Sequence, residues 1–169
     1  MRALRSLFRF VLEIQGFIVA CARVDREADC IEIEGRRHGN AKPKCQHCGS
    51  KLTGELRTEW SRWRHLDLLK KRLYVVAARR EGYCSGCGGR RLERVPWASA
   101  NAFHTKAFDR EVARLVQVAN RTAVSRMFDV TWRTVGRMVA RVVAKPTSWP
   151  QDKKGEQACR SASGSSAWA

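Results

Sequence analysis

Two pairs of cysteines give the chain its clearest chemical signal, because each forms a Cys-x-x-Cys motif, at residues 45–48 and 84–87. Two thiolates separated by two residues reach one metal ion, with bonds of about 2.3 Å, if the backbone turns tightly between them. Gly49 and Gly88 follow the two motifs, and glycine accepts the positive φ that such a turn often needs. We therefore predict one metal site with four thiolate ligands: Cys45, Cys48, Cys84 and Cys87.

The metal expected at this site is a structural Zn²⁺. Zinc favours thiolate, and four cysteines fill its tetrahedral shell, so no position remains for a substrate or an activated water. A thioredoxin-like redox motif needs one Cys-x-x-Cys in a strand–helix–strand context, which two pairs around a hairpin do not offer. Incidental cysteines remain the alternative, and His47 is an alternative ligand. Cys21, Cys30 and Cys159 lack partners at ligand spacing, and His65 is interpreted as an ordinary strand residue.

A second pattern, over residues 121–143, predicts a helix-turn-helix motif. Thr122 is expected to cap the first helix. Asp129 and Val130 are expected to form the turn, and Thr131 to cap the second helix. An ordinary helical core with a solvated basic surface is the alternative interpretation. The residues expected to face inward are Ala123, Val124, Met127, Phe128, Val135, Met138, Val139 and Val142.

Arg133, Arg137 and Arg141 recur every four residues on the second helix and are expected to line its outer face. A capped, arginine-bearing second helix is how a recognition helix enters the major groove of duplex DNA. Arg133 is expected to read base edges, and Arg141 is expected to contact phosphate. The cations of a basic turn at residues 70–72 are also expected to contact phosphate. The predicted DNA-contacting residues are Thr131, Trp132, Arg133, Thr134, Arg137, Arg141, Lys70, Lys71 and Arg72.

The composition favours a polyanionic partner. The 169 residues hold 33 Lys and Arg against 16 Asp and Glu, a formal net charge of +17, and such an excess attracts phosphate. The hydrophobic fraction of 44% excludes a wholly disordered chain. No apolar run approaches the roughly 20 residues that a membrane-spanning helix needs. Arg9, Glu13 and Gln15 interrupt the N-terminal apolar stretch, so we expect no export signal and a cytoplasmic protein.

The sequence patterns around these residues predict an α+β fold. We expect a helix over residues 4–14, followed by a hairpin of strands at 15–24 and 30–34. The strands of a zinc ribbon with four cysteine ligands, at 64–69 and 73–80, meet at the basic turn, and the later apolar spacing is helical. The expected division is an N-terminal helix and hairpin segment (1–40), the zinc ribbon (41–97), the helix-turn-helix module (103–145) and a disordered tail (146–169).

In this order the motifs resemble the N-terminal part of ISL-three family transposases, over roughly residues 1–145. The resemblance implies that the ribbon and the helix-turn-helix bind the terminal inverted repeats of the element. It also implies a following RNase-H-like domain, whose Asp/Asp/Glu triad holds divalent metal. The resemblance is carried by Cys-x-His-Cys-Gly-Ser at 45–50, the tetrapeptide at 64–67, an apolar strand ending in Arg79 and Arg80, Tyr-Cys-x-x-Cys-Gly at 83–88, and the helix-turn-helix.

Beyond residue 145 the sequence departs from that family. The catalytic domain should begin with an apolar strand bearing the first aspartate, but no such strand precedes Asp152, and about 24 residues cannot align three carboxylates around metal ions. Asp152 and Glu156 are therefore interpreted as tail charges, and we expect a truncated or frame-shifted transposase that is not an enzyme. Its expected partners are duplex DNA and either a second copy or a full-length transposase. A stand-alone transcriptional regulator and a zinc-ribbon RNA-binding protein remain the alternatives.

Overall fold

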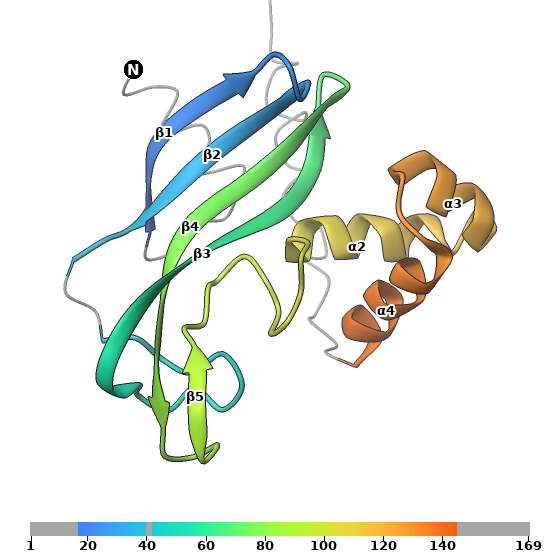
Figure 1. Cartoon of the computed structure of the whole chain (residues 1–169). Helices are drawn as coiled ribbons and strands as arrows, with labels where there is room; N and C mark the ends of the chain where they lie inside the picture. Colours follow the sequence, from blue (N-terminus) through green and yellow to red (C-terminus); the bar gives the residue numbers. More distant parts are fainter. Residues whose placement is uncertain (1–16, 40–41, 145–169) are drawn as a thin grey trace, which may run out of the picture.

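The computed structural model describes residues 17–39 and 42–144, which form an α+β fold of one sheet and three helices (Figure 1). The helix expected over residues 4–14 and the tail expected from 146 onward lie outside these ranges. The described elements are β1 (Phe17–Asp25), β2 (Cys30–Arg37), β3 (Thr53–Leu68), β4 (Lys71–Cys84), β5 (Gly89–Leu92), α2 (Lys106–Leu115), α3 (Arg121–Phe128) and α4 (Trp132–Val143).

The sheet has the strand order β1-β2-β4-β3, and β5 pairs with the far end of β4. The pairs β1/β2, β3/β4 and β4/β5 are antiparallel, whereas β2 and β4 run parallel, with Cys30 opposite Arg72 and Gly35 opposite Ala77. The N-terminal hairpin and the ribbon, expected as successive segments, therefore share one sheet. Ile33 and Val75, which lie opposite each other, are both fully buried, so burial of a common apolar face accounts for the pairing.

One face of the sheet carries the larger core. The segment that follows β5 covers this face, and its Trp97 ring packs edge-on against Phe17 and Trp63, with ring centroids 4.7 and 5.5 Å away. The ribbon strands are longer than predicted, because β3 and β4 continue past the core toward the cysteine motifs (Figure 1). The buried residues of this core are Phe17, Val19, Ile33, Trp63, Leu73, Val75, Ala77, Val95, Trp97 and Ala98.

The three helices pack around a second core. Asn120 caps α3 by accepting a hydrogen bond from the Ala123 backbone N–H, at 2.7 Å, so the predicted cap at Thr122 is wrong. Ala123 is exposed and Met127 is 71% exposed, which also corrects two of the inward positions. In the described ranges, no helix is both long and apolar enough to cross a bilayer. The buried residues of this core are Phe108, Val112, Val124, Val135 and Met138, with Leu66, Leu115, Val116, Phe128 and Val130 packed against them.

The helical module is fixed to the end of β3. Thr105 caps α2, accepting a hydrogen bond from the Phe108 backbone N–H, and its hydroxyl lies 2.8 Å from Nδ1 of His65. Burial lowers the pKa of His65 to about 4, so the ring is neutral and Nδ1 can accept a hydrogen bond from the Thr105 hydroxyl. Beside it, Arg64 donates from Nη1 to the Asp129 carbonyl oxygen at 3.4 Å. The interpretation of His65 as an ordinary strand residue is confirmed.

Candidate metal centre and nucleic-acid interface

The two cysteine motifs come together in space. Cys45 and Cys87 have their sulfur atoms 3.9 Å apart, Cys48 and Cys84 have theirs 3.3 Å apart, and all four sulfurs lie within 4.8 Å of one another. Four sulfurs at about 2.3 Å from a central tetrahedral ion would be about 3.8 Å apart. The cluster therefore has the size and the donor set for one tetrahedral metal ion.

The backbone of each motif forms a tight turn. The N–H of Gly49 bonds the Cys45 carbonyl at 3.0 Å, and the N–H of Gly88 bonds the Cys84 carbonyl at 2.9 Å. Gly49 has φ 79° and Gly88 has φ 66°, so the glycines provide the positive φ expected of them. The His47 backbone N–H also points at the Cys45 sulfur, 3.4 Å away, which stabilises a thiolate at that position.

The rest of the sheet holds the two turns against each other. The N–H of Gln46 bonds the Leu92 carbonyl at 3.0 Å, and the N–H of Arg94 bonds the Lys44 carbonyl at 2.7 Å. The first motif thus docks on β5, which follows directly from the second motif. Buried apolar support is small, since the core at this end consists of Leu52 and the cysteines themselves.

The thiols of the cluster differ in acidity. Hydrogen bonds from the Ser50 side chain and backbone lower the pKa of Cys48 to about 6, whereas the Cys48 side chain raises the pKa of Cys87 to about 12. Burial raises the pKa of Cys84 as well. Four neighbouring sulfurs cannot all become anions without a compensating charge, and a divalent cation supplies that charge.

The other cysteines and histidines of the described ranges lie outside the four-sulfur group. Cys21 lies near Glu34, with its sulfur 3.4 Å from the carboxylate, and Cys30 is buried against Arg62. His47 is exposed, and the four-sulfur group does not include it. Cys159 lies outside the described ranges.

Helices α3 and α4 form a compact helix-turn-helix. Asp129 ends α3 in the left-handed region, at φ 50° and ψ 54°, as its short polar side chain allows. Thr131 caps α4, accepting a hydrogen bond from the Thr134 backbone N–H at 3.2 Å, so the predicted cap is confirmed. Val135 and Met138 turn into the core, which fixes the rotation of α4 and leaves its opposite face to solvent.

The start of α4 presents its side chains to solvent. Trp132 is 58% exposed, Arg133 and Arg137 are exposed, and the Arg133 guanidinium lies over the Trp132 ring, 5.7 Å from its centroid. Arg121, the first residue of α3, was not among the predicted DNA-contacting residues. Its Nη1 lies 3.7 Å from where a Cβ on Gly136 would stand, which places a further cation beside α4.

Arg141 does not share this exposed surface. Its guanidinium makes two hydrogen bonds of 2.8 Å to the carboxylate of Asp109, which is 2% exposed, so the predicted position on the outer face is wrong. Burial raises the pKa of Asp109, and the hydrogen bonds from Arg141 oppose that rise. The physical reason is helical geometry, since two steps of four residues turn a side chain about 80° from Arg133. Arg141 therefore ties α4 to α2.

The basic turn between β3 and β4 lies beside the helix-turn-helix. Arg72 forms an ion pair with Asp129, and Lys71 forms one with Asp29 of the β1–β2 turn. Lys70, at φ 65°, is exposed at the tip. All of these groups are substantially exposed, and such ion pairs contribute little to stability, so both cations can exchange a carboxylate for a phosphate. The ion pair between Arg72 and Asp129 places the basic turn beside the residue that ends α3, two positions before the cap of α4.

Comparison with known proteins agrees with this geometry. Residues 93–143 match the helix-turn-helix domain of transposase family ISL3. The chain is 38% identical over 102 residues to the transposase for insertion sequence element IS1557 of Mycobacterium tuberculosis, a match that covers 60% of this chain. It is 33% identical over 91 residues to the transposase for insertion sequence element IS1001 of Bordetella parapertussis, covering 54% of this chain. The predicted resemblance to ISL3 transposases is confirmed.

The matched part is a minor fraction of those relatives. It spans 23% of the IS1557 transposase and 22% of the IS1001 transposase. No solved structure shows a significant match to the chain. The comparisons thus identify a helix-turn-helix domain of transposase type and the region before it.

Proposed function

We propose that the described residues bind duplex DNA and recognise the terminal inverted repeats of an insertion sequence. The observation that carries this proposal is the exposed start of α4, a Thr131-capped helix presenting Trp132, Arg133 and Arg137 within a domain of the ISL3 transposase type. The net charge of +17 supports a phosphate-bearing partner.

In this proposal α4 enters the major groove with its N-terminal end toward the bases. Arg133 donates two hydrogen bonds to a guanine edge, and Arg137, one turn later, reaches the next base step or its phosphate. Trp132 offers apolar surface to a thymine methyl group. Thr131 and Thr134 hold each other at the helix start, where their hydroxyl oxygens are 2.9 Å apart, and orient the helix at the backbone.

The cations around α4 serve as anchors. Lys70, Lys71 and Arg72 at the hairpin tip, and Arg121 at the start of α3, contact phosphates and set the register of α4 on the duplex. They add affinity without sequence preference, because phosphates carry no base identity. Arg141 has no part in DNA binding, since Asp109 holds it.

A structural Zn²⁺ held by Cys45, Cys48, Cys84 and Cys87 completes the proposal. The donor set of four sulfurs, all within 4.8 Å of one another, suits zinc, and a closed shell of four thiolates leaves no open coordination position. The ion would supply cross-linking rather than catalysis, holding the first motif and β5 together at the far end of the sheet.

The test is selection of bound duplexes from a random pool by the full chain, at a fixed salt concentration. We expect one motif to be enriched and to match inverted repeats that flank the gene. Enrichment of a motif found only in a promoter would support a transcriptional regulator instead. Preferential binding of structured RNA over duplex DNA at the same salt would overturn the proposal. The Arg137→Ala variant keeps the helical core, and we expect it to enrich the selected motif less strongly than the wild type does.

A further inference from the structure

The first half of β3 is exposed on both of its faces. Every residue from Thr53 to Trp60 is exposed, whereas a strand that covers a core is buried at alternate positions. On one side β3 pairs with β4. On its other side, within the described ranges, Arg64 is the first residue of β3 with a backbone partner. Its N–H donates to the Phe103 carbonyl, and its C=O accepts from the Thr105 N–H, both at 2.9 Å. From Arg57 to Trp63 the described residues give this edge no backbone partner, whereas before Arg57 the strand is irregular, with Gly54 at φ 75° and the Glu55 carbonyl accepting from Nη2 of Arg90.

The bonds of Arg64 define which groups point outward along this edge. In an antiparallel strand the N–H and C=O of one residue point the same way, and successive residues alternate. Because Arg64 points away from β4, so do Arg62, Trp60 and Thr58, since β3 stays in regular register with β4 from Arg57 to His65. Such an edge is a template for another strand.

We infer that two copies of this chain pair through their β3 edges, antiparallel, about a two-fold axis at Thr58. The edge is regular only from Arg57 onward, after an irregularity between Thr53 and Arg57, and Thr58 is the position within it at which opposite charges meet across a two-fold axis. At that centre the outward N–H and C=O of Thr58 bond the same groups of the second copy, which is an allowed hydrogen-bonded pair.

The charges along the edge favour the same register. With the axis at Thr58, Arg57 of each copy lies opposite Glu59 of the other. Within its own sheet Arg57 lies opposite Glu81, and Glu59 lies opposite Arg79. The pairing would therefore extend a row of alternating charges across both copies. An axis at Arg57 or at Glu59 would put like charges face to face, which is unfavourable.

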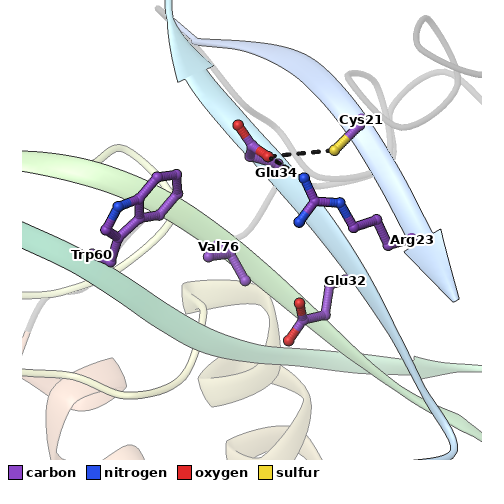
Figure 2. Close-up of a pocket in the computed structure, with 6 residues that line it drawn as sticks. All are labelled: Cys21, Arg23, Glu32, Glu34, Trp60 and Val76. Carbon is purple, nitrogen blue, oxygen red and sulfur yellow. Dashed lines mark hydrogen bonds and ion pairs between the residues drawn. The ribbon is translucent and has the colours of Figure 1, made fainter. Parts of the chain in front are cut away.

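Two apolar residues lie close to this axis: Trp60, two residues beyond it on the regular strand, and Leu56, at the end of the irregular segment before Arg57. These side chains are 62% and 40% exposed, and both lie on the face of the sheet that turns away from the main core. Figure 2 shows Trp60 projecting from β3 on the same face as Val76. Both residues line a cavity of ≈ 440 Å³. Pairing would cover part of this surface with a second apolar side chain.

The first test is a charge exchange, read by sedimentation of the full chain without DNA at about 0.3 M salt, where long-range repulsion is screened. We expect a concentration-dependent dimer. Arg57→Glu alone and Glu59→Arg alone should each weaken dimerisation about tenfold or more, because each creates two like-charge pairs. Mixing the two single variants should restore it as a mixed dimer, because every charge pair across the seam is then opposite while each chain keeps only its own single change. A monomer at every concentration, or a mixture as weak as the single variants, overturns the inference.

The second test is a cross-link at the axis. In a hydrogen-bonded antiparallel pair the two Cα atoms are about 5.5 Å apart, which suits a disulfide. Thr58→Cys should therefore form a covalent dimer on mild oxidation, seen on a non-reducing gel. Thr122→Cys, an exposed threonine on α3, is the matched control and keeps all native cysteines. If Thr58→Cys cross-links no more than Thr122→Cys, the axis is not at Thr58. Neither test involves DNA, so its outcome is independent of the proposed function.

Discussion

The cysteine end of the sheet and the helical module reach their folded state by different means. At the cysteine end, Leu52 and three cysteines make up the whole local core. In the helical module Phe108, Val112, Val135 and Met138 are all fully buried, and further apolar side chains pack around them. In the proposed site an ion holds the two turns of the first region together, whereas the second region is held together by apolar burial. The two ends of one chain should therefore respond differently to the same treatment.

Metal removal should give the largest difference between the two regions. Structural zinc sites have apparent binding free energies on the order of 10–16 kcal/mol at neutral pH, which a small core cannot replace. Chelation, or Cys84→Ser, should abolish amide-exchange protection at residues 42–52 and 83–94. Protection of α2, α3 and α4 should persist. The measurement is hydrogen exchange of the full chain by residue.

The control for this prediction is Cys21→Ser, which removes a thiol outside the four-sulfur group. It should leave both the metal content and the exchange pattern unchanged. Purified chain that folds normally with well under one metal ion per molecule would contradict the comparison. So would loss of helical protection together with that of the cysteine end.

Breaking the pair between Arg141 and Asp109 should unfold the helical module and spare the metal site. Arg141→Ala leaves a buried carboxylate without its partner, which costs about 3–5 kcal/mol. Arg137→Ala, on the exposed side of the same helix, should change stability by no more than about 0.5 kcal/mol. Urea unfolding followed by helical circular dichroism measures both, with metal content as a parallel reading. Unchanged stability of Arg141→Ala, with weaker DNA binding, would restore the phosphate role that the sequence suggested.

Acid should loosen the junction between the sheet and the helices through His65. Its folded pKa of about 4 is below the ordinary value of 6.5, so the unfolded chain binds the proton more readily. This contribution is fully present above pH 6.5 and is lost as the pH falls toward 4, by about 3 kcal/mol in total. His65→Asn keeps an acceptor for the Thr105 hydroxyl and cannot titrate.

The measurement is the free energy of unfolding between pH 7 and pH 4.5, for the wild type and for His65→Asn. Acid also protonates metal-bound thiols in both proteins, so the difference between the two curves isolates the histidine. The wild-type curve should fall more steeply with acid. Parallel curves would show that His65 has no part in the pH dependence.

The smallest expected effect distinguishes residues that recognise bases from residues that contact phosphates, within the proposed DNA-binding surface. Arg133→Ala should reduce discrimination between the selected site and scrambled duplex by about 1–3 kcal/mol. Lys70→Ala should weaken binding to both duplexes equally and reduce the salt dependence by about one unit of slope. Titrations at several salt concentrations measure both. If Lys70→Ala alone removes discrimination, the hairpin tip reads the sequence and α4 is the anchor.

The sequence predicted best those features that depend on local chemistry. The glycine after each Cys-x-x-Cys, the cap at Thr131 and the left-handed turn residue Asp129 follow from the backbone needs of a tight turn or a helix start. The cysteine grouping followed from ligand spacing. Each cap, turn and Cys-x-x-Cys motif is contained in a few consecutive residues, and the two cysteine motifs were paired because they share the same ligand spacing.

The features that the sequence did not predict depend on distant partners. Nothing within β2 indicates a parallel neighbour 42 positions later, at Cys30 and Arg72, because the pairing depends on apolar faces that meet only in the folded chain. The four-residue spacing of Arg141 is that of a residue on an exposed helix face. Its side chain instead bonds Asp109 on α2, a partner that the spacing does not indicate. Asn120 and Thr122 are both good caps, and the choice between them depends on where α3 meets its neighbours.

The parallel pair between β2 and β4 also has a consequence for synthesis on the ribosome. β2 ends at Arg37 and β4 at Cys84, so 47 further residues must be made before the whole neighbour of β2 exists. At about 5–20 residues per second, the β1–β2 hairpin waits roughly 2–9 s with the outer edge of β2 unpaired. During that interval the nascent chain has a strand edge open to chaperones and to neighbouring nascent chains. The arrival of β4 pairs that edge, and Ile33 is covered only later, when the segment containing Trp97 packs on the same face.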